Sequence, residues 1–220
     1  MVALHPLTTG CRVLIPLRDL VREYGVRPGP VLHVGAHRAE ELGDYRREGF
    51  GPVWWVEGNP DLIPTLRLKV AMARHHVVHA VLADRERDVT FHVASNGQSS
   101  SILPLGTHAT EHPEVTYVAE RAVRTTTIDT LSAAGALGQD PAPFLNLDVQ
   151  GAELDVLKGG ERYLAGVRWV YTEVNEKELY TGCALLPEMD AWLEGRGFVR
   201  VAAHLLGHGW GDALYVRSQL

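Results

Sequence analysis

Carboxylate side chains follow two of the buried apolar runs of this 220-residue chain. Asp148 comes directly after the run 144–147, and Glu173 lies near the end of the run 167–174. The carboxyl ends of parallel strands meet at one edge of a sheet, so both side chains would face one crevice. There Asp148 could orient a ligand's amino group, hold a divalent metal ion, or accept a proton from a substrate hydroxyl. Glu173 could share a metal ion with Asp148, position a substrate hydroxyl, or pair with an arginine.

A glycine turn and an acid about 20 residues later form a second set of candidates. Gly35 follows the run 31–34, and Glu57 ends the strand that begins at residue 53. A residue without a Cβ lets a ligand approach the backbone, and the acid is placed to accept the hydroxyls of an adenosine ribose. A dinucleotide fold needs a second glycine where the backbone meets the pyrophosphate, and His37 stands there. The turn therefore favours an adenosyl ligand without a pyrophosphate, and an NAD(P)-type oxidoreductase is the alternative.

Two polar loops could complete such a site. Residues 95–118 are rich in serine, threonine, histidine, proline and glycine. A loop this long in a compact domain is usually functional, so we expect it to close over the ligand, with Ser100 contributing to binding. His208 lies in a second polar tip near the C-terminus. An ordinary histidine pKa of about 6.5 suits a general base for an alcohol, although a lone histidine is more often structural.

The order of the expected elements specifies the sheet that positions these residues. Short apolar runs alternate with helical periodicities, which predicts an α/β fold with a doubly wound, mostly parallel sheet. Near the C-terminus two runs around a glycine-rich turn predict an antiparallel hairpin. We predict helices over 16–25, 38–48, 59–74, 128–134, 151–164 and 186–194, and strands over 31–34, 53–57, 77–81, 85–95, 121–127, 144–147, 167–174, 198–203 and 213–216.

Composition limits the class of protein. With 45% hydrophobic and 22% charged residues, the chain should form one domain over 1–220, with 1–29 as an N-terminal helical extension. A net charge of -6 predicts no nucleic-acid partner. No apolar run reaches the roughly 18 residues of a membrane helix, and residues 1–12 show no secretory signal. Two cysteines, Cys11 and Cys183, form no CxxC pair, so we expect a cytoplasmic protein that binds no membrane. An exposed Leu185–Leu186 region could support a homodimer.

Four sequence blocks together resemble the FkbM-type methyltransferases. They lie in that family's order between about residue 30 and residue 217: Val34–His37, Glu57–Pro60, Thr126–Asp129, and Asp148–Glu153 with Leu157–Gly159. The resemblance implies a class I methyltransferase (Rossmann-like) fold with S-adenosylmethionine as methyl donor. It also implies O-methylation of a hydroxyl on a sugar, glycan or natural-product scaffold.

The resemblance assigns places along the donor molecule. The implied donor-binding residues are Gly35 and His37 at the methionine end, Glu57 and Asn59 at the ribose, Ala83 and Asp84 near the adenine, Ser100 in the closing loop, and Asp148 near the sulfonium. The candidate catalytic residues are Asp148, Glu173 and His208. Asp148 and Glu173 would hold Mg²⁺ if the reaction requires it.

Three positions depart from the family's pattern. His33 stands where an aspartate is common, Ala39 replaces a common glycine, and Gln150 replaces a common glutamate. His33 would weaken an indirect hold on the donor's amino group, and Ala39 adds only a methyl group. Gln150 keeps a hydrogen-bonding group without the charge, so we assign it no catalytic role. A donor-binding module without catalytic activity is a further alternative.

Overall fold

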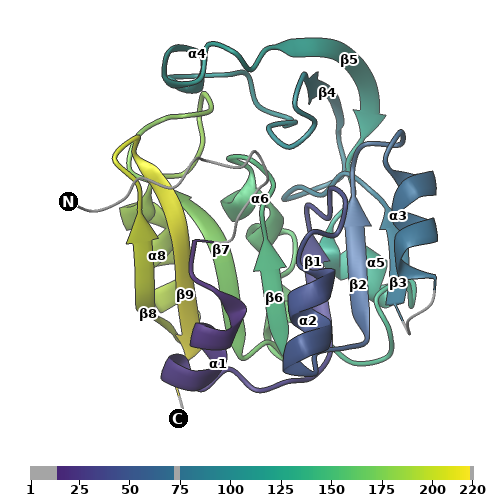
Figure 1. Ribbon diagram of the computed structural model, residues 1–220, viewed down its shortest axis with the longest axis vertical. Coiled ribbons are helices and arrows are strands. Elements are labelled where there is room, and N and C mark those ends of the chain that lie inside the picture. The colour runs from purple at the N-terminus through teal and green to yellow at the C-terminus, as the bar shows by residue number, and fades with distance from the viewer. Residues whose placement is uncertain (1–13, 72–74, 219–220) are drawn as a thin grey trace.

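The computed structural model describes residues 14–71 and 75–218, arranged around a seven-stranded sheet and a separate pair of strands (Figure 1). The strands are β1 (Val31–Val34), β2 (Val53–Glu57), β3 (His75–His79), β4 (Asp88–Ala94), β5 (Tyr117–Arg124), β6 (Phe144–Leu147), β7 (Trp169–Asn175), β8 (Phe198–Leu205) and β9 (Trp210–Arg217). The large sheet has the order β3-β2-β1-β6-β7-β9-β8, and β9 alone runs opposite in direction to the other strands. The predicted doubly wound, mostly parallel sheet with a C-terminal antiparallel hairpin is confirmed.

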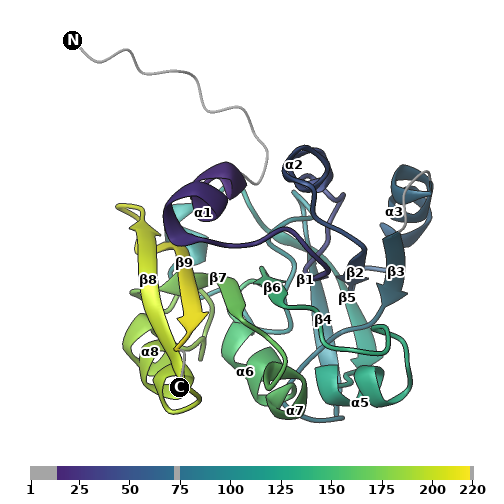
Figure 2. The same cartoon turned by 90° about the horizontal axis from the view of Figure 1, so that it is seen from below.

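Helices cover both faces of this sheet. They are α1 (Leu17–Tyr24), α2 (Leu42–Glu48), α3 (Ile63–Val70), α4 (His108–Glu111), α5 (Ile128–Ala133), α6 (Glu153–Lys158), α7 (Glu161–Leu164) and α8 (Leu186–Glu194). Figure 2 shows α1, α2 and α3 on one face and α5 to α8 on the other. The N-terminal helix predicted over 16–25 is α1.

The central strands are mostly apolar because both of their faces are buried. Successive side chains of a strand point to opposite faces, so each strand contributes to two cores. In β1, Val31 packs with Leu20 and Leu66 on the α1–α3 face. Its neighbour Leu32 packs with Val156 on the other face. Because both faces of each central strand are packed, the carboxyl ends of the parallel strands are held in place. The polar candidate site residues lie at these ends.

Three predicted helices have different bounds in the structure. The helix predicted over 38–48 begins only at Leu42, because the backbone before it turns through positive φ at His37 and Ala39. The helix predicted over 151–164 is divided into α6 and α7. Its Gly159 lies so close to the segment after β3 that an added Cβ would be 2.1 Å from the Ala83 carbonyl oxygen. The helix predicted over 59–74 is α3, and residues 72–74 lie outside the described residues.

Two predicted strands are displaced along the chain. The strand predicted over 77–81 is β3, two residues earlier, so residues 80–82 lie beyond its carboxyl end. The strand predicted over 121–127 is β5, and the loop predicted over 95–118 includes α4 and the start of β5. The interpretation of residues 1–12 and Cys11 falls on residues 1–13, which lie outside the described residues.

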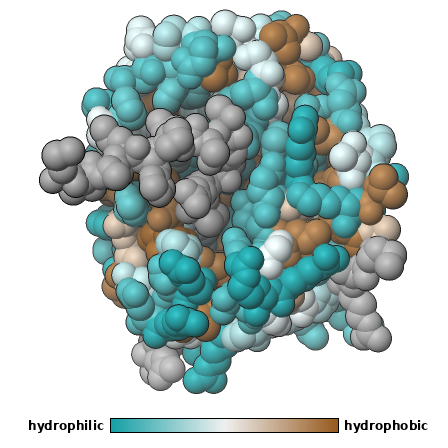
Figure 3. Space-filling view, viewed as in Figure 1, coloured by the Kyte–Doolittle hydropathy of each residue, from teal (hydrophilic) through white to brown (hydrophobic). Residues whose placement is uncertain are grey.

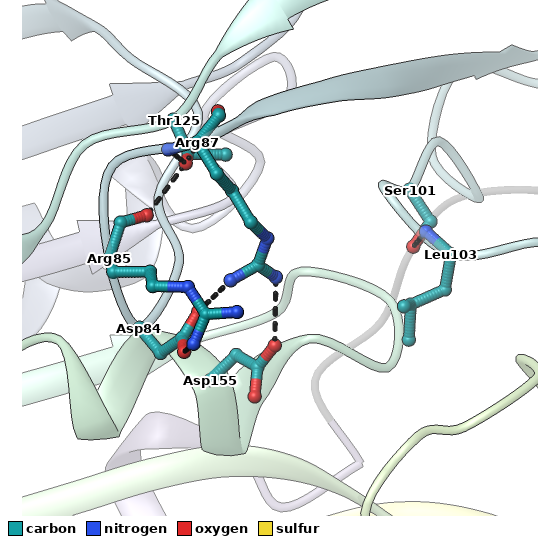
Figure 4. Close-up of polar contacts among 7 residues, drawn as sticks. All are labelled: Asp84, Arg85, Arg87, Ser101, Leu103, Thr125 and Asp155. Atoms are coloured by element: carbon teal, nitrogen blue, oxygen red, sulfur yellow. Dashed lines mark hydrogen bonds and ion pairs between the residues drawn. The ribbon is translucent and has the colours of Figure 1, made fainter.

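The β4–β5 pair lies beyond the carboxyl ends of β1 and β2 (Figure 1). Just before β4, the guanidinium of Arg87 donates to Asp84 and, at 3.3 Å, to Asp155 of α6 (Figure 4). The hydroxyl of Thr125 accepts from the Arg87 N–H at 2.9 Å and donates to the Arg85 carbonyl at 2.7 Å. These contacts join the start of the pair to the large sheet, so the pair is held above the strand ends.

Candidate active site

A pocket lies at the carboxyl ends of β1, β2 and β6, beneath the segment that follows β4. It encloses about 740 Å³, part of which is open to solvent. Its wall includes residues from the turns after all three of these strands and from the segment 97–102. This is the crevice in which open α/β sheets bind ligands. The sequence predicts that the polar strand ends and the long loop lie together around one crevice. Five of the predicted residues line this pocket: Gly35, His37, Glu57, Ser100 and Asp148.

The turn after β1 brings a second turn into close contact. An added Cβ at Gly35, where φ is +88°, would lie 1.7 Å from the Asp148 carbonyl oxygen. Only glycine therefore allows these two turns to meet. Among the described residues, the non-glycine positions with positive φ are His37, Ala39 and Gln150, all in these two turns. Such backbone strain is characteristic of functional sites.

The carboxylate of Glu57 is fixed by backbone donors at the end of β2. Its Oε2 accepts from the His37 N–H and its Oε1 from the Asn59 N–H, each at 2.7 Å. Burial raises the pKa of Glu57, while these two donors lower it. Each oxygen keeps a further lone pair, so the anchored carboxylate can accept two ligand hydroxyls.

The ring of His37 has one satisfied and one unsatisfied nitrogen. Its Nδ1 lies 2.8 Å from the carboxylate of Glu40. Its Nε2 is buried and has no hydrogen-bond partner among the described residues. Next to it lies Gly97, where an added Cβ would be 3.1 Å from Nε2. Because buried polar atoms are normally paired, Nε2 indicates a polar ligand in the pocket.

Gln150 connects Asp148 to groups behind the pocket. Its amide nitrogen donates to Asp148 Oδ1 at 2.5 Å and to Glu173 Oε2 at 2.9 Å. Its amide oxygen accepts from the Tyr180 hydroxyl at 2.6 Å. Gln150 and Tyr180 are not among the predicted site residues. The departure of Gln150 from the family's common glutamate is the one signal in the sequence, and nothing in the sequence points to Tyr180.

Glu173 is buried behind this amide and does not line the pocket. Burial, followed by the nearby charges of Asp148 and Glu153, raises the pKa of Glu173 well above its ordinary value. Glu153 itself holds the turn, since its Oε1 accepts from the N–H groups of Val149 and Gly151 at 2.9 and 3.1 Å. Glu173 is therefore joined by hydrogen bonds to the pocket residue Asp148 through Gln150.

The structure does not bring Ala83 and Asp84 into the pocket wall. Asp84 is paired with Arg85 and Arg87 instead. Because β3 ends earlier than predicted, the wall on that side is formed by an apolar set: Ala80, Val81, Leu82 and Phe91.

Two further candidate residues, Asn59 and Ser100, form hydrogen bonds with the backbone of the loops in which they lie. The side-chain oxygen of Asn59 accepts from the Asp61 N–H at 3.0 Å and so shapes the turn before α3. Ser100 lines the pocket, and its hydroxyl accepts from the Ala94 N–H and donates to the Gly97 carbonyl.

His208 lies apart from this pocket. It is exposed on the turn between β8 and β9, and its Nδ1 lies 3.1 Å from the Glu111 carboxylate of α4. Its ring also contacts that of His112, with centroids 5.6 Å apart. His208 thus belongs to a contact between α4 and the hairpin.

The residues do not fit a Mg²⁺ ion held by Asp148 and Glu173. The amide nitrogen of Gln150 bridges these two carboxyl groups. Within residues 14–71 and 75–218, no group of three histidine, cysteine or acidic side chains is arranged to hold a metal ion.

Hydrophilic side chains cover most of the face shown in Figure 3, and hydrophobic ones form small separate groups. The predicted dimer region is not exposed: Leu185 and Leu186 are half-buried, and Leu186 packs against the core. A homodimer stays a prediction. In the described part of the chain, no helix is long and apolar enough to cross a membrane.

Comparison with known proteins identifies the family. The model of the methyltransferase FkbM domain matches residues 33–200. The chain belongs to the FkbM methyltransferase family. It is similar to the 2-O-methyltransferase NoeI of Sinorhizobium fredii (strain NBRC 101917 / NGR234), with 32% identity over 117 residues. That match covers 50% of this chain and 47% of NoeI, so the chain spans about half the length of this relative.

Solved structures of methyltransferases share the fold of this FkbM-family chain. The FkbM methyltransferase from Methylobacillus flagellatus KT has a TM-score of 0.58 at 15% identity, covering 91% of this chain and 48% of that one. The magnesium protoporphyrin IX methyltransferase from Synechocystis PCC 6803, solved with bound SAM, has a TM-score of 0.54 at 11% identity. That match covers 92% of this chain and 76% of the Synechocystis enzyme. The predicted class I methyltransferase fold is therefore confirmed.

Proposed function

We propose that this FkbM-family chain transfers the methyl group of S-adenosylmethionine to a hydroxyl of a sugar, glycan or natural-product scaffold. The observation that carries the proposal is the Glu57 carboxylate, held in the pocket by the N–H groups of His37 and Asn59. The family and the name of NoeI, a 2-O-methyltransferase, support O-methylation.

The pocket residues fit this donor. Gly35 lets the Asp148 turn pack directly against its backbone at the pocket wall, and the buried Nε2 of His37 lacks a partner among the described residues. The apolar wall at residues 80–82 with Phe91 suits the flat adenine ring. Glu57 lies between these two ends and suits the ribose hydroxyls. When bound, S-adenosylmethionine supplies a methyl group activated by its positively charged sulfur.

Asp148 is placed to take the proton of the acceptor hydroxyl. It lines the pocket, and the Gln150 amide fixes one of its oxygens at 2.5 Å. A hydrogen bond donated to a carboxylate favours its ionised form, which is the form that can accept a proton. The same amide also donates to Glu173, so the orientation of Asp148 is tied to the buried groups behind it. Holding the oxygen and the methyl group in line then accounts for much of the rate.

The test is isothermal titration with S-adenosylmethionine, S-adenosylhomocysteine and NAD. We expect both adenosyl ligands to bind and NAD not to bind. Glu57→Ala should weaken both at least tenfold, about 1.4 kcal/mol, because the ribose hydroxyls lose a charged acceptor. The matched control is Glu23→Ala, at an exposed acid on α1, which should leave binding unchanged.

Two results would overturn the proposal. Binding of NAD instead of the adenosyl ligands would support the oxidoreductase alternative. Donor binding without methyl transfer to any hydroxylated acceptor, with or without Mg²⁺, would support a binding module without catalytic activity.

A further inference from the structure

Glu41 is a nearly buried acid in the wall of the pocket, in the turn before α2. Its side chain is 15% exposed. It also borders a small cavity under α1, so α1 shields it from solvent on that side. A carboxyl group in such a position is costly to ionise unless a cation lies beside it.

Among the described residues, no Lys or Arg side chain forms an ion pair with the Glu41 carboxyl. The ring of His33 lies beside it, with Nε2 3.9 Å from the carboxyl. Burial lowers the pKa of His33 to about 4, so this ring is neutral at pH 7. The charge of Lys69 lowers the pKa of Glu41, but it is the weakest of the contributing causes, and the ammonium donates to the Arg38 carbonyl.

The carboxyl of Asp148 approaches the same end of the pocket. Its charge acts on Glu41 strongly enough to contribute to the rise in the pKa of Glu41. Burial is the main cause of that rise, with Glu40 and Asp148 adding to it, and the pKa of Glu41 reaches about 8. Two acids that face one end of a pocket favour a positively charged ligand group there.

We propose that Glu41 binds the ammonium group of the donor's methionine moiety and gives up its own proton when the donor binds. This inference rests on the proposed function, because the methionine end of an adenosyl donor carries that ammonium group. In the free protein Glu41 holds a proton at pH 7. On binding, the O–H bond breaks, the proton passes to solvent, and the carboxylate pairs with the ammonium group, which stays protonated.

Among the described residues, the other titratable groups that face Glu41 are not expected to release a proton at pH 7 when the donor binds. The groups that face Glu41 are His33 on β1, Glu40 in the same turn, Tyr45 on α2, Lys69 on α3 and Asp148 after β6. At pH 7 His33 is already neutral. Burial alone would raise the pKa of Glu40. The hydrogen bond to His37 and the charge of His37 outweigh burial, so the pKa of Glu40 lies below its ordinary value. Burial raises the pKa of Tyr45 well above its ordinary value, so this hydroxyl stays protonated.

The experiment compares three ligands by isothermal titration. S-adenosylmethionine and S-adenosylhomocysteine carry the ammonium group, whereas 5′-methylthioadenosine lacks the amino-acid part. Glu41→Gln should weaken the first two at least tenfold and leave the third within about twofold. The matched control is Glu40→Gln. Glu40 also lines the pocket, but its carboxylate is already paired with His37, so it should cause a smaller loss.

Proton release gives a second readout that needs no variant. Titrations of the wild-type protein at pH 7 in two buffers of different ionisation enthalpy should show about one proton released per S-adenosylhomocysteine. The affinity for this ligand should rise from pH 6 to pH 8, by up to about tenfold per pH unit. Methylthioadenosine should release no proton and show no such rise.

Each contrary result has its own meaning. If none of the three ligands binds the wild-type protein, the proposed function fails. If all three bind, and Glu41→Gln weakens them equally or not at all, the role of Glu41 alone is overturned. A loss confined to S-adenosylmethionine would place the sulfonium, and not the ammonium group, at Glu41.

Discussion

The two ends of the pocket differ in the kind of side chain that forms them. One end is apolar, with residues 80–82 and Phe91, and the other has His37, Glu41 and Asp148. An apolar wall selects a flat ring by shape and buried area, whereas acids select a charge. The adenine end should therefore hold any adenosyl compound, and the methionine end should decide which compound binds and whether chemistry follows.

The largest expected effect is a fall in kcat, caused by a substitution at the polar end of the pocket. Asp148→Asn keeps the shape of the side chain but removes its ability to take a proton. We expect kcat to fall about 10²- to 10⁴-fold, the usual range for loss of a general base. The measurement is kcat with saturating donor, together with the dissociation constant of S-adenosylhomocysteine. An unchanged kcat with a raised dissociation constant would show that Asp148 serves binding alone.

A change beside Asp148 should move the pH profile. Gln150→Glu places a third carboxyl group against Asp148 and Glu173, and a neighbouring like charge raises the pKa of Asp148. The base must be ionised to act, so activity should be lost at low pH and its acidic limb should move upward by about one pH unit. The matched control is Gln98→Glu, at another pocket residue. If the acidic limb of the pH profile does not move in Gln150→Glu, then Gln150 does not influence the catalytic base.

The smallest effect is expected at the apolar end. Phe91→Ala removes an aromatic face, which is worth about 0.5–1.5 kcal/mol, or roughly twofold to tenfold in affinity. S-adenosylmethionine, S-adenosylhomocysteine and methylthioadenosine should weaken equally. Val123→Ala, in the same small hydrophobic cluster but outside the pocket wall, is the control. A loss limited to the ligands with an amino-acid part would contradict the orientation of the donor.

The two ends also differ in how far the sequence predicts them. Gly35 and Glu57 follow short apolar runs, and the ends of such runs are determined by local pattern. Ala83 and Asp84 lie outside the pocket because β3 ends two residues earlier than its apolar run suggests. Strand bounds depend on pairing with β2, which no local window contains.

Glu41 and Gln150 lie beyond sequence reasoning for another reason. Glu41 falls within the helix predicted over 38–48, and no role is predicted for it from the sequence. Its burial comes from the strained turn at His37 and Ala39 and from the packing of α1 beside α2. Gln150 bonds to Glu173 and Tyr180, more than 20 residues away along the chain. Such contacts arise only when the whole sheet has formed.

The most direct test of the account is a crystal structure of the protein grown with S-adenosylhomocysteine. The account predicts ribose hydroxyls within hydrogen-bonding distance of the Glu57 carboxylate, adenine against residues 80–82 and Phe91, and the amino group beside Glu41. A ligand bound in the reverse direction, or outside this pocket, would contradict it.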